Sequence, residues 1–306
     1  MTWFHHALVT GGAGFIGSHL TDRLVENCEV TVYDDFSNGD ADHVPEEASV
    51  IQADVRKRKP LADAVAEADV VFHEAAQVSV QQSVSNPKSS QEVNVDPMLT
   101  ILESARDTDT RVILASSAAL YGHPIYLPID EEHPKEPTSP YGLEKLTADH
   151  YCRLYHDLYE VETVALRYFN AYGPRQQGGD YSGVISIFRD QALANDDITV
   201  EGDGEQTRDF VHVDDIVQAN LLAATSDDAV GKAFNIGTGD SITIRELADT
   251  IKNVTDSESD IVHVDSREGD IDRSEASIDK AREVLGFQPE YTVFEGLRDY
   301  LGQGRP

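Results

Sequence analysis

The first 170 residues alternate between short apolar runs and longer segments of mixed polarity. Short apolar runs bounded by polar residues are typical of strands that are buried on both faces of a sheet. Strands that alternate with helices indicate an α/β protein with a doubly wound parallel sheet. The pattern predicts strands at residues 6–10, 29–34, 50–54, 70–74, 112–116 and 163–167, and helices at about residues 15–27, 93–105 and 141–159.

The pattern loosens after Asn170, where glycine and proline interrupt short segments, as in Gly173-Pro174 and Gly202-Asp203-Gly204. We expect a smaller C-terminal substrate-binding lobe there. It would cover the carboxyl edge of the sheet, where ligands of open α/β sheets bind. The predicted division is a first domain of residues 1–169, to which a segment at about 209–236 returns, and a lobe of residues 170–208 and 237–306.

Gly11, Gly14 and Gly17 form a GxxGxxG pattern directly after the first predicted strand. Glycine permits a tight turn and a close approach of the backbone to a pyrophosphate. The N-terminus of the following helix then faces the negative charge. This context favours a dinucleotide site over a glycine-rich turn of purely structural purpose.

Asp34 ends the second predicted strand, 20 residues after Gly14. A carboxylate there accepts hydrogen bonds from ribose hydroxyls and repels a 2′-phosphate. No Arg follows in the run Asp35-Phe36-Ser37-Asn38-Gly39, which favours NAD over NADP. After the third strand, Asp54-Val55 could contact the adenine edge, although Asp54 could also cap a helix.

Tyr141 and Lys145 are four residues apart and would share one face of a helix. A free phenol has a pKa of about 10. A nearby ammonium and a positively charged nicotinamide would both favour the phenolate, which would make Tyr141 a usable base. Ser117, just past the fifth strand, could hydrogen-bond the same hydroxyl. Alone, the pair could be a helix-start aromatic and a solvated charge, but with the glycine loop it predicts alcohol–ketone redox chemistry.

The chain is strongly acidic, with 56 Asp and Glu against 24 Lys and Arg and a formal net charge of −32; eight of those 24 are Lys. An acidic surface repels nucleic acid and anionic membranes, so we expect neither as a partner. Acid spread along the whole chain with little Lys predicts a halophilic protein, since concentrated salt screens self-repulsion. An ordinary acidic cytosolic protein is the alternative.

The sequence gives no indication of export, a membrane span or a metal site. The longest apolar runs are too short to cross a membrane, and the first residues lack a signal-peptide pattern. Cys28 and Cys152 are the only cysteines and have no CxxC spacing, which indicates a reducing compartment. The eleven His are scattered. We therefore expect a cytoplasmic enzyme without a catalytic metal.

Four segments carry a resemblance to a known family: residues 10–20, 116–122, 140–145 and 167–175. They resemble the extended short-chain dehydrogenases/reductases, which are NAD-dependent epimerases and dehydratases, and are most similar to the UDP-glucose 4-epimerase branch. The resemblance implies a Rossmann-type fold, NAD as cofactor, a UDP-sugar substrate and a homodimer formed through helices near residues 93–105 and 141–159.

The resemblance also implies residue roles. Tyr141 would remove the proton of the sugar 4-hydroxyl, Lys145 would bind the nicotinamide ribose, and Ser117 would bridge the hydroxyl and Tyr141. The implied cofactor-binding residues are Gly11, Gly14, Phe15, Ile16, Gly17, Asp34, Asn38, Gly39, Asp54, Val55, Ala75, Ala76, Gln77, Asn94, Ser116, Tyr141, Lys145 and Tyr168. The implied substrate-binding residues are Ser117, Asn170, Arg208, Arg267, Asp270 and Ser274.

Arginine suits the diphosphate because its planar guanidinium makes multidentate contacts with phosphate. The resemblance assigns the diphosphate to Asn170, Arg208 and Arg267, and the uridine ribose to Asp270. Surface salt bridges are the alternative for the two arginines. Ser274 matches a position that limits sugar bulk, and its small side chain suggests tolerance of an N-acetyl group.

Ala118 and Ala119 stand where the dehydratase relatives carry an Asp-Glu pair. Without those acids, oxidation at C4 has no built-in elimination step, so the resemblance implies 4-epimerisation of a UDP-hexose. UDP-glucose and UDP-galactose are the expected pair, with the N-acetylated pair as a further possibility. The alternatives are a UDP-glucuronate 4-epimerase, a 4,6-dehydratase, and a non-catalytic NAD-binding regulator.

Overall fold

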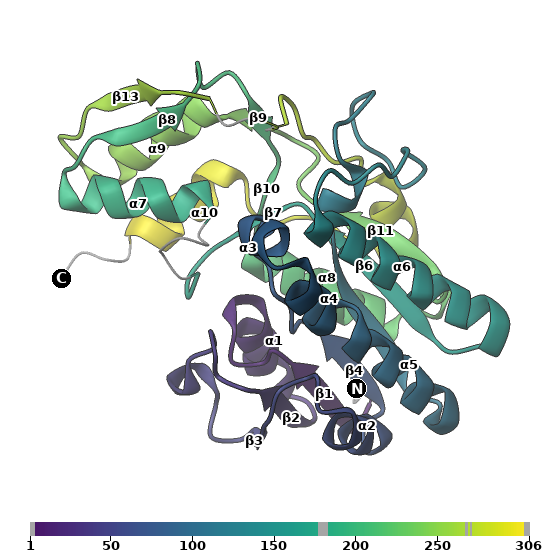
Figure 1. The fold of residues 1–306 in the computed structure, drawn as a ribbon. Coiled ribbons are helices and arrows are strands. Elements are labelled where there is room, and N and C mark those ends of the chain that lie inside the picture. Colours follow the sequence, from purple (N-terminus) through teal and green to yellow (C-terminus); the bar gives the residue numbers. More distant parts are fainter. Residues whose placement is uncertain (1–3, 177–182, 267–268, 270, 303–306) are drawn as a thin grey trace.

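The computed structural model describes residues 4–176, 183–266, 269 and 271–302. Its centre is a seven-stranded sheet in the order β11-β6-β5-β4-β1-β2-β3, in which all neighbours are parallel (Figure 1). The strands are β1 His6–Thr10, β2 Glu29–Asp34, β3 Ser49–Gln52, β4 Val70–His73, β5 Arg111–Ser117, β6 Thr163–Tyr168 and β11 Lys232–Ile236. The predicted Rossmann-type α/β fold is confirmed.

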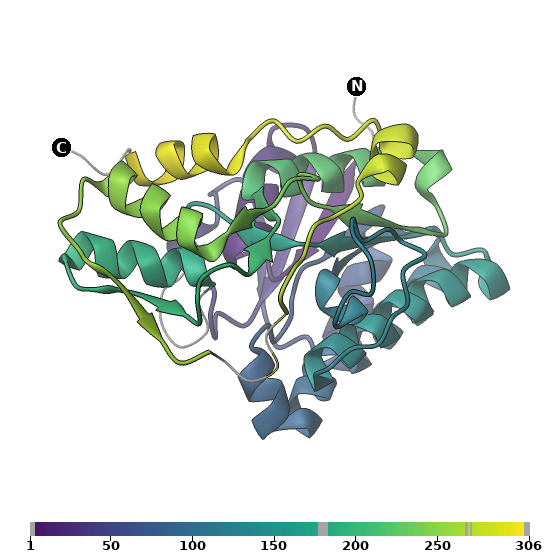
Figure 2. The same cartoon turned by 90° about the horizontal axis from the view of Figure 1, so that it is seen from above.

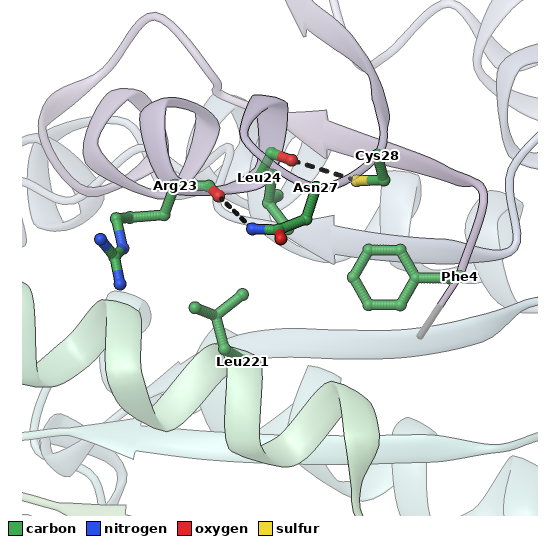
Figure 3. Close-up of a pocket in the computed structure, with 6 residues that line it drawn as sticks. All are labelled: Phe4, Arg23, Leu24, Asn27, Cys28 and Leu221. Atoms are coloured by element: carbon green, nitrogen blue, oxygen red, sulfur yellow. Dashed lines mark hydrogen bonds between the residues drawn. The ribbon is translucent and has the colours of Figure 1, made fainter. Parts of the chain in front are cut away.

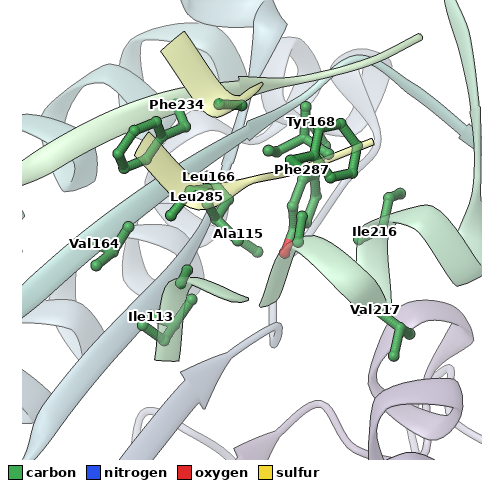
Figure 4. Close-up of a cluster of buried hydrophobic side chains, with 14 of the residues drawn as sticks. Ile113, Ala115, Val164, Leu166, Tyr168, Ile216, Val217, Phe234, Leu285 and Phe287 are labelled. Atoms are coloured by element: carbon green, nitrogen blue, oxygen red, sulfur yellow. The ribbon is translucent and has the colours of Figure 1, made fainter. Parts of the chain in front are cut away.

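Helices cover both faces of this sheet, as Figure 2 shows from above. The side chains of successive strand residues point to opposite faces of the sheet. Ala7 and Val9 belong to one apolar cluster, and Leu8 belongs to the other. The first face is covered by α1 Phe15–Val25, α8 Val213–Thr225 and the π-helical turn η4 Ala281–Leu285. The second is covered by α2 Arg58–Ala66, α5 Asp96–Thr108 and α6 Pro140–Tyr159. Figure 4 shows part of the first cluster, where Phe287 and Leu285 meet the sheet.

A third apolar cluster lies outside the large sheet and forms a smaller layer of helices and strands (Figure 1). It is built by α7 Val184–Ala194, α9 Ile244–Thr255, α10 Val293–Gly302, β8 Ile198–Glu201 and β13 Ile261–Val264. Two short sheets pair β7 Asn170–Tyr172 with β10 Phe210–His212, and β9 Thr207–Arg208 with β12 Ile242–Thr243. The remaining elements are α3 Val80–Ser85, α4 Pro87–Asn94, η1 Ala41–His43, η2 Ala118–Tyr121 and η3 Asp227–Ala229.

The chain returns to the large sheet late in the sequence, because α8 covers its first face and β11 extends its edge. The return of a segment at about 209–236 to the first domain stays a prediction. The division into two domains stays a prediction. No helix among the described residues is long and apolar enough to span a membrane.

The predicted helix at 93–105 is wrong at its start. The structure has two helices there, α4 and α5, with Val95 between them. Pro97 lies in the first turn of α5, where its missing N–H does no harm. The sequence pattern of two helices is read as one helix when no loop residues separate them.

The third strand ends at Gln52, two residues before the predicted end. Asp54 turns the chain instead: its carboxylate accepts the backbone N–H of Arg56 at 2.8 Å. This is an Asx turn, and the N-cap of α2 is Lys57. The alternative in which Asp54 caps the helix is therefore wrong.

Candidate active site

The glycine loop after β1 is shaped for a close ligand. Gly11 has φ +71°, and a Cβ built there would lie 2.7 Å from the backbone nitrogen of Ala75, so only glycine fits without a backbone shift. Gly14 is the N-cap of α1. Among the described residues no side chain caps this helix, and its first turn holds no acid. The first N–H groups of α1, from Phe15 and Ile16 onward, thus suit a pyrophosphate.

Asp34 braces this loop from the end of β2. Its carboxylate accepts the N–H of Ala13 at 3.0 Å and the N–H of Phe36 at 2.8 Å. A carboxylate has about four lone-pair sites, so Asp34 retains capacity for ribose hydroxyls. Gly39 packs against Ala13, and Asn38 is exposed beside it.

Asp54 and Val55 leave the adenine contact a prediction. The guanidinium of Arg56 donates to Asp54 at 2.9 Å, and this contact, together with neighbouring positive charge, holds the pKa of Asp54 below its usual value despite its partial burial. The side chain of Val55 is buried in the second apolar cluster.

The loop of Ala75, Ala76 and Gln77 follows β4 and is held by Asn94. The side-chain oxygen of Asn94 accepts the N–H of Gln77 at 2.9 Å. Its amide nitrogen donates to the carbonyl of Gln77 at 3.0 Å and to the carboxylate of Glu144 at 2.7 Å. Asn94 is buried. In this structure it positions the cofactor-side loop on α4 and α6.

The start of α6 presses against the turn that follows β5. Ser139 caps the helix by accepting the N–H of Gly142 at 3.1 Å. A Cβ on Gly142 would lie 2.6 Å from the carbonyl oxygen of Ala119, so this glycine permits the close approach. As a result Tyr141 reaches Ser117, with a hydrogen bond between the two side chains.

Lys145 completes the predicted catalytic set. Its Nζ lies 5.9 Å from the ring centroid of Tyr141 and donates to the carbonyl oxygen of Ala115 at 2.7 Å. Burial lowers the pKa of Lys145 to about 8, and the carboxylates of Glu74 and Glu144 oppose that fall. Ser117, Tyr141 and Lys145 therefore meet at the carboxyl ends of β5 and β6.

The expected lowering of the Tyr141 pKa does not come from the protein groups. Burial raises the pKa of Tyr141, while the hydrogen bond with Ser117 opposes the rise and Glu144 adds to it. Desolvation of the phenolate outweighs the hydrogen bond here. The positive nicotinamide remains the group expected to favour the phenolate.

Two further cofactor candidates, Tyr168 and Ser116, make internal hydrogen bonds. The Tyr168 hydroxyl donates to Glu74 at 2.9 Å and accepts from the Asn220 amide at 2.7 Å. Ser116 donates to Asp149 at 3.3 Å. Both residues lie at the ends of their strands, at the same edge as Lys145.

The described substrate-side candidates lie along the segment from Thr207 to Asp209. Asn170 donates its amide to the carbonyl of Asp209 at 2.9 Å, and Arg208 precedes it in the chain. Ser274 donates its N–H to the carbonyl of Thr207 at 3.1 Å. The structure thus brings Asn170, Arg208 and Ser274 to neighbouring backbone segments. Arg267 and Asp270 lie outside the described residues.

Asp209 itself is a residue that sequence reasoning missed. Its fully buried carboxylate accepts four hydrogen bonds, from the N–H and hydroxyl of Thr238, the N–H of Gly239 and the N–H of Ala276, at 2.8–3.1 Å. It ties the segment that carries Arg208 to the loops after β11 and before η4. Glu74 was also missed. The sequence signal for a functional role of Glu74 was its position directly after an apolar strand, at the edge of the sheet where ligands bind.

Two other features lie apart from this site. A pocket between α1 and α8 is lined by Phe4, Leu24, Cys28 and Leu221, at the end of α1 opposite to the glycine loop (Figure 3). Within the described residues, no group of three or more His, Cys, Asp or Glu is placed to hold a metal ion.

The fold and this site define a dinucleotide-dependent enzyme in which Ser117, Tyr141 and Lys145 lie together at the carboxyl edge of the sheet. The chain belongs to the NAD dependent epimerase/dehydratase family, whose model matches residues 7–237. The predicted family, the predicted cofactor NAD and the epimerase class of enzyme are confirmed.

Comparisons with individual proteins agree. The chain is 43% identical over 296 residues to a putative UDP-glucose 4-epimerase of Methanocaldococcus jannaschii, covering 95% of each. It is 36% identical over 262 residues to a UDP-N-acetyl-α-D-glucosaminuronate decarboxylase of Bacillus cytotoxicus, covering 82% of this chain and 81% of that one.

Two solved structures superpose on the chain with a TM-score of 0.93, 35% identity and 97% coverage of both chains. One is a UDP-glucose 4-epimerase of Thermotoga maritima with UDP-glucose. The other is a UDP-N-acetylglucosamine 4-epimerase of Methanobrevibacter ruminantium in complex with UDP-N-acetylmuramic acid.

Proposed function

We propose that the protein is an NAD-dependent 4-epimerase of a UDP-hexose, with UDP-glucose and UDP-galactose as the first pair to test. The observation that carries the proposal is the meeting of Ser117, Tyr141 and Lys145 beside a glycine loop that fits a dinucleotide.

Each catalytic side chain has a defined task in this proposal. Tyr141 takes the proton of the sugar 4-hydroxyl and later returns one to the 4-keto oxygen. Ser117 holds the sugar hydroxyl and the phenol together. Lys145 donates to the nicotinamide ribose. When bound, NAD supplies the acceptor and then the donor of the C4 hydride. The 4-keto sugar turns between the two transfers, so the opposite face is reduced.

The turn after Ser117 favours epimerisation over elimination. Ala118 and Ala119 begin η2, and the N–H of Ala119 donates to the Ser117 hydroxyl at 3.2 Å. Neither side chain can donate or accept a proton. A 4,6-dehydratase needs an acid and a base at this point, so the two alanines argue against it.

The sugar itself is open to a wider proposal. Ser274 is small and buried, and its backbone hydrogen bond to Thr207 brings it close to Arg208. We extend the proposed substrates to the UDP-GlcNAc and UDP-GalNAc pair. Asn170, Arg208 and Arg267 are proposed to hold the diphosphate of the UDP moiety, and Asp270 its ribose.

A second copy of the chain is the proposed partner, and α6 is the proposed contact. Leu143, Leu154 and Leu158 are 46–60% exposed, and their spacing places them on one face of this helix. Such a stripe on a long helix would be covered by another subunit. We also propose that the protein works in the cytoplasm at high salt, which the charge of −32 and the unpaired cysteines Cys28 and Cys152 support.

The test incubates the protein in high salt with NAD and, separately, UDP-glucose, UDP-GlcNAc and UDP-glucuronate, with products read by proton NMR. The 4-epimer of a UDP-hexose without net NADH is the expected product. A 4-epimer of UDP-glucuronate alone, or a 4-keto-6-deoxy or decarboxylated product, would move the protein to another reaction class. Binding of NAD without turnover of any sugar would favour the regulator.

A further inference from the structure

Glu74 is an acidic residue at the carboxyl edge of the sheet to which the proposed mechanism gives no task. It directly follows β4, and its N–H donates to the carbonyl of Thr10 at 3.1 Å. A Cβ on Gly11 would lie 3.0 Å from the carbonyl carbon of Glu74. The backbone of Glu74 therefore packs against the glycine loop and borders the cofactor site.

The carboxylate of Glu74 is anchored from the α8 side of the sheet. The Tyr168 hydroxyl donates to it at 2.9 Å, and the amide of Asn220 on α8 donates to that hydroxyl at 2.7 Å. Asn220 is fully buried, and the ring of Tyr168 packs into the first apolar cluster (Figure 4). This chain of hydrogen bonds fixes the position of an acid that is largely withdrawn from water.

Lys145 approaches the same point from the opposite face. Its ammonium donates to the carbonyl of Ala115 on β5. Because β4 and β5 are parallel with His73 opposite Leu114, the next step along the strands brings Glu74 beside Ala115. The Lys145 ammonium and the backbone of Glu74 thus lie at the same end of two neighbouring strands.

The two groups act on each other's ionisation. Burial raises the pKa of Glu74 to about 7, and the Tyr168 hydrogen bond and Lys145 oppose the rise. The pKa of Lys145, lowered by burial to about 8, is supported by Glu74 and Glu144. The charge of Lys145 also disfavours protonation of His73, but burial is the larger cause that lowers the pKa of His73 to about 3 and leaves its ring neutral.

We propose that Glu74 is a positioning residue that keeps Lys145 protonated beside the cofactor. The inference rests on the proposed role of Lys145. Glu144, the other carboxylate, already accepts from Ser90 at 2.6 Å and from Asn94 at 2.7 Å. Glu74 stands beside Ala115, the residue whose carbonyl accepts from Lys145, and its carboxylate has the Tyr168 hydroxyl as its hydrogen-bond donor. An ammonium keeps three donors and a full charge for Ala115 and a ribose hydroxyl, whereas a neutral amine loses one donor and the charge.

Glu74→Gln is the decisive variant, because glutamine retains an acceptor for the Tyr168 hydroxyl and removes the charge. Affinity for NAD is measured by isothermal titration calorimetry between about pH 6 and 10, a range chosen to bracket the reference pKa values. In the unaltered protein, affinity falls as Lys145 loses its proton. Removing a negative neighbour lowers the pKa of a cation, so in the variant this fall is expected about one pH unit lower.

Two matched variants serve as controls. Glu26→Gln removes a carboxylate that is 59% exposed at the C-cap of α1 and should leave the midpoint unchanged. Glu74→Asp keeps the charge and should lie nearer to the unaltered protein than Glu74→Gln does. A midpoint of Glu74→Gln equal to that of Glu26→Gln would overturn the inference.

Turnover supplies an independent readout. The alkaline limb of the pH–rate profile should move down in Glu74→Gln by the same shift. If no UDP-sugar is turned over but the NAD midpoint still shifts, the proposed function fails and the inference about Glu74 stands. If Glu74→Gln does not fold, Tyr168→Phe removes the anchor and should give a smaller downward shift, whereas an unmoved midpoint would contradict the inference.

Discussion

Gly11→Ala separates the cost of an unusual backbone angle from the cost of a steric contact. Gly11 and Gly286 both have φ +71°, but a Cβ on Gly286 would meet nothing within 4 Å. Alanine at such an angle costs about 1–2 kcal/mol. About 0.4–1 kcal/mol of this is offset, because alanine restricts the unfolded chain. Gly286→Ala should therefore lose about 1 kcal/mol of unfolding free energy.

Gly11→Ala carries an additional penalty. Its Cβ would lie 2.7 Å from the nitrogen and 2.8 Å from the Cα of Ala75, which are backbone atoms and cannot rotate away. Overpacking of this kind costs about 1–3 kcal/mol more, for a total of about 2–4 kcal/mol. The shift of the loop should also weaken NAD binding at least about tenfold, or 1.4 kcal/mol.

The assay is urea unfolding followed by circular dichroism in high salt, with NAD affinity from calorimetry on both variants. Gly286→Ala should bind NAD like the unaltered protein, because η4 contacts the edge strand β11, which three other strands separate from β1 and its loop. Equal losses of stability and unchanged NAD affinity in both variants would refute the argument that Gly11 is required by close approach.

Four further outcomes are expected. Tyr141→Phe should lower turnover at least about 100-fold with little change in NAD affinity, read by proton NMR and calorimetry; unchanged turnover would remove Tyr141 as the base. Asp209→Asn turns an amide NH₂ toward two backbone N–H donors, so thermal unfolding should report a loss of about 2–6 kcal/mol, and a loss below 1 would contradict this. Leu158→Glu on α6 should dissociate a dimer in sedimentation velocity, whereas Leu193→Glu, at a 63% exposed position of α7, should not; equal sedimentation of both would exclude α6 as the contact. With a net charge of −32, the midpoint of thermal unfolding should rise from low to molar salt, and a flat or falling midpoint would count against halophily.

The sequence was sufficient for the order of the first six strands and for placing Tyr141 and Lys145 on one helix, because these depend on local patterns. Each apolar run lies in the strand it predicted, and the spacing of Tyr141 and Lys145 needs only a helix. The register of β4 against β5, which brings Glu74 beside Ala115, depends on the assembled sheet and leaves no periodic signal. The sign of the Tyr141 pKa shift was missed for a related reason, since burial is a property of the packed structure.

The four hydrogen bonds that Asp209 accepts show a second limit of prediction from the sequence. Four donors from Thr238, Gly239 and Ala276 reach one carboxylate from segments that are distant in the chain. In the sequence, Asp209 is simply an acid beside an arginine in an acidic protein. Only the fold distinguishes it from the many aspartates on the surface.

The route of the chain between its apolar clusters has a consequence for how the protein comes apart. The chain leaves the large sheet after β6, returns for α8 and β11, departs for α9, comes back for η4 and departs again for α10. The large sheet with its helices and the smaller layer around α7, α9 and α10 are therefore two bodies. The chain connects them by several crossings, not by one linker. Neither body is a contiguous stretch that could be cut out as a fragment. Limited proteolysis should accordingly nick loops without releasing a stable half, and heating should melt both bodies in one transition.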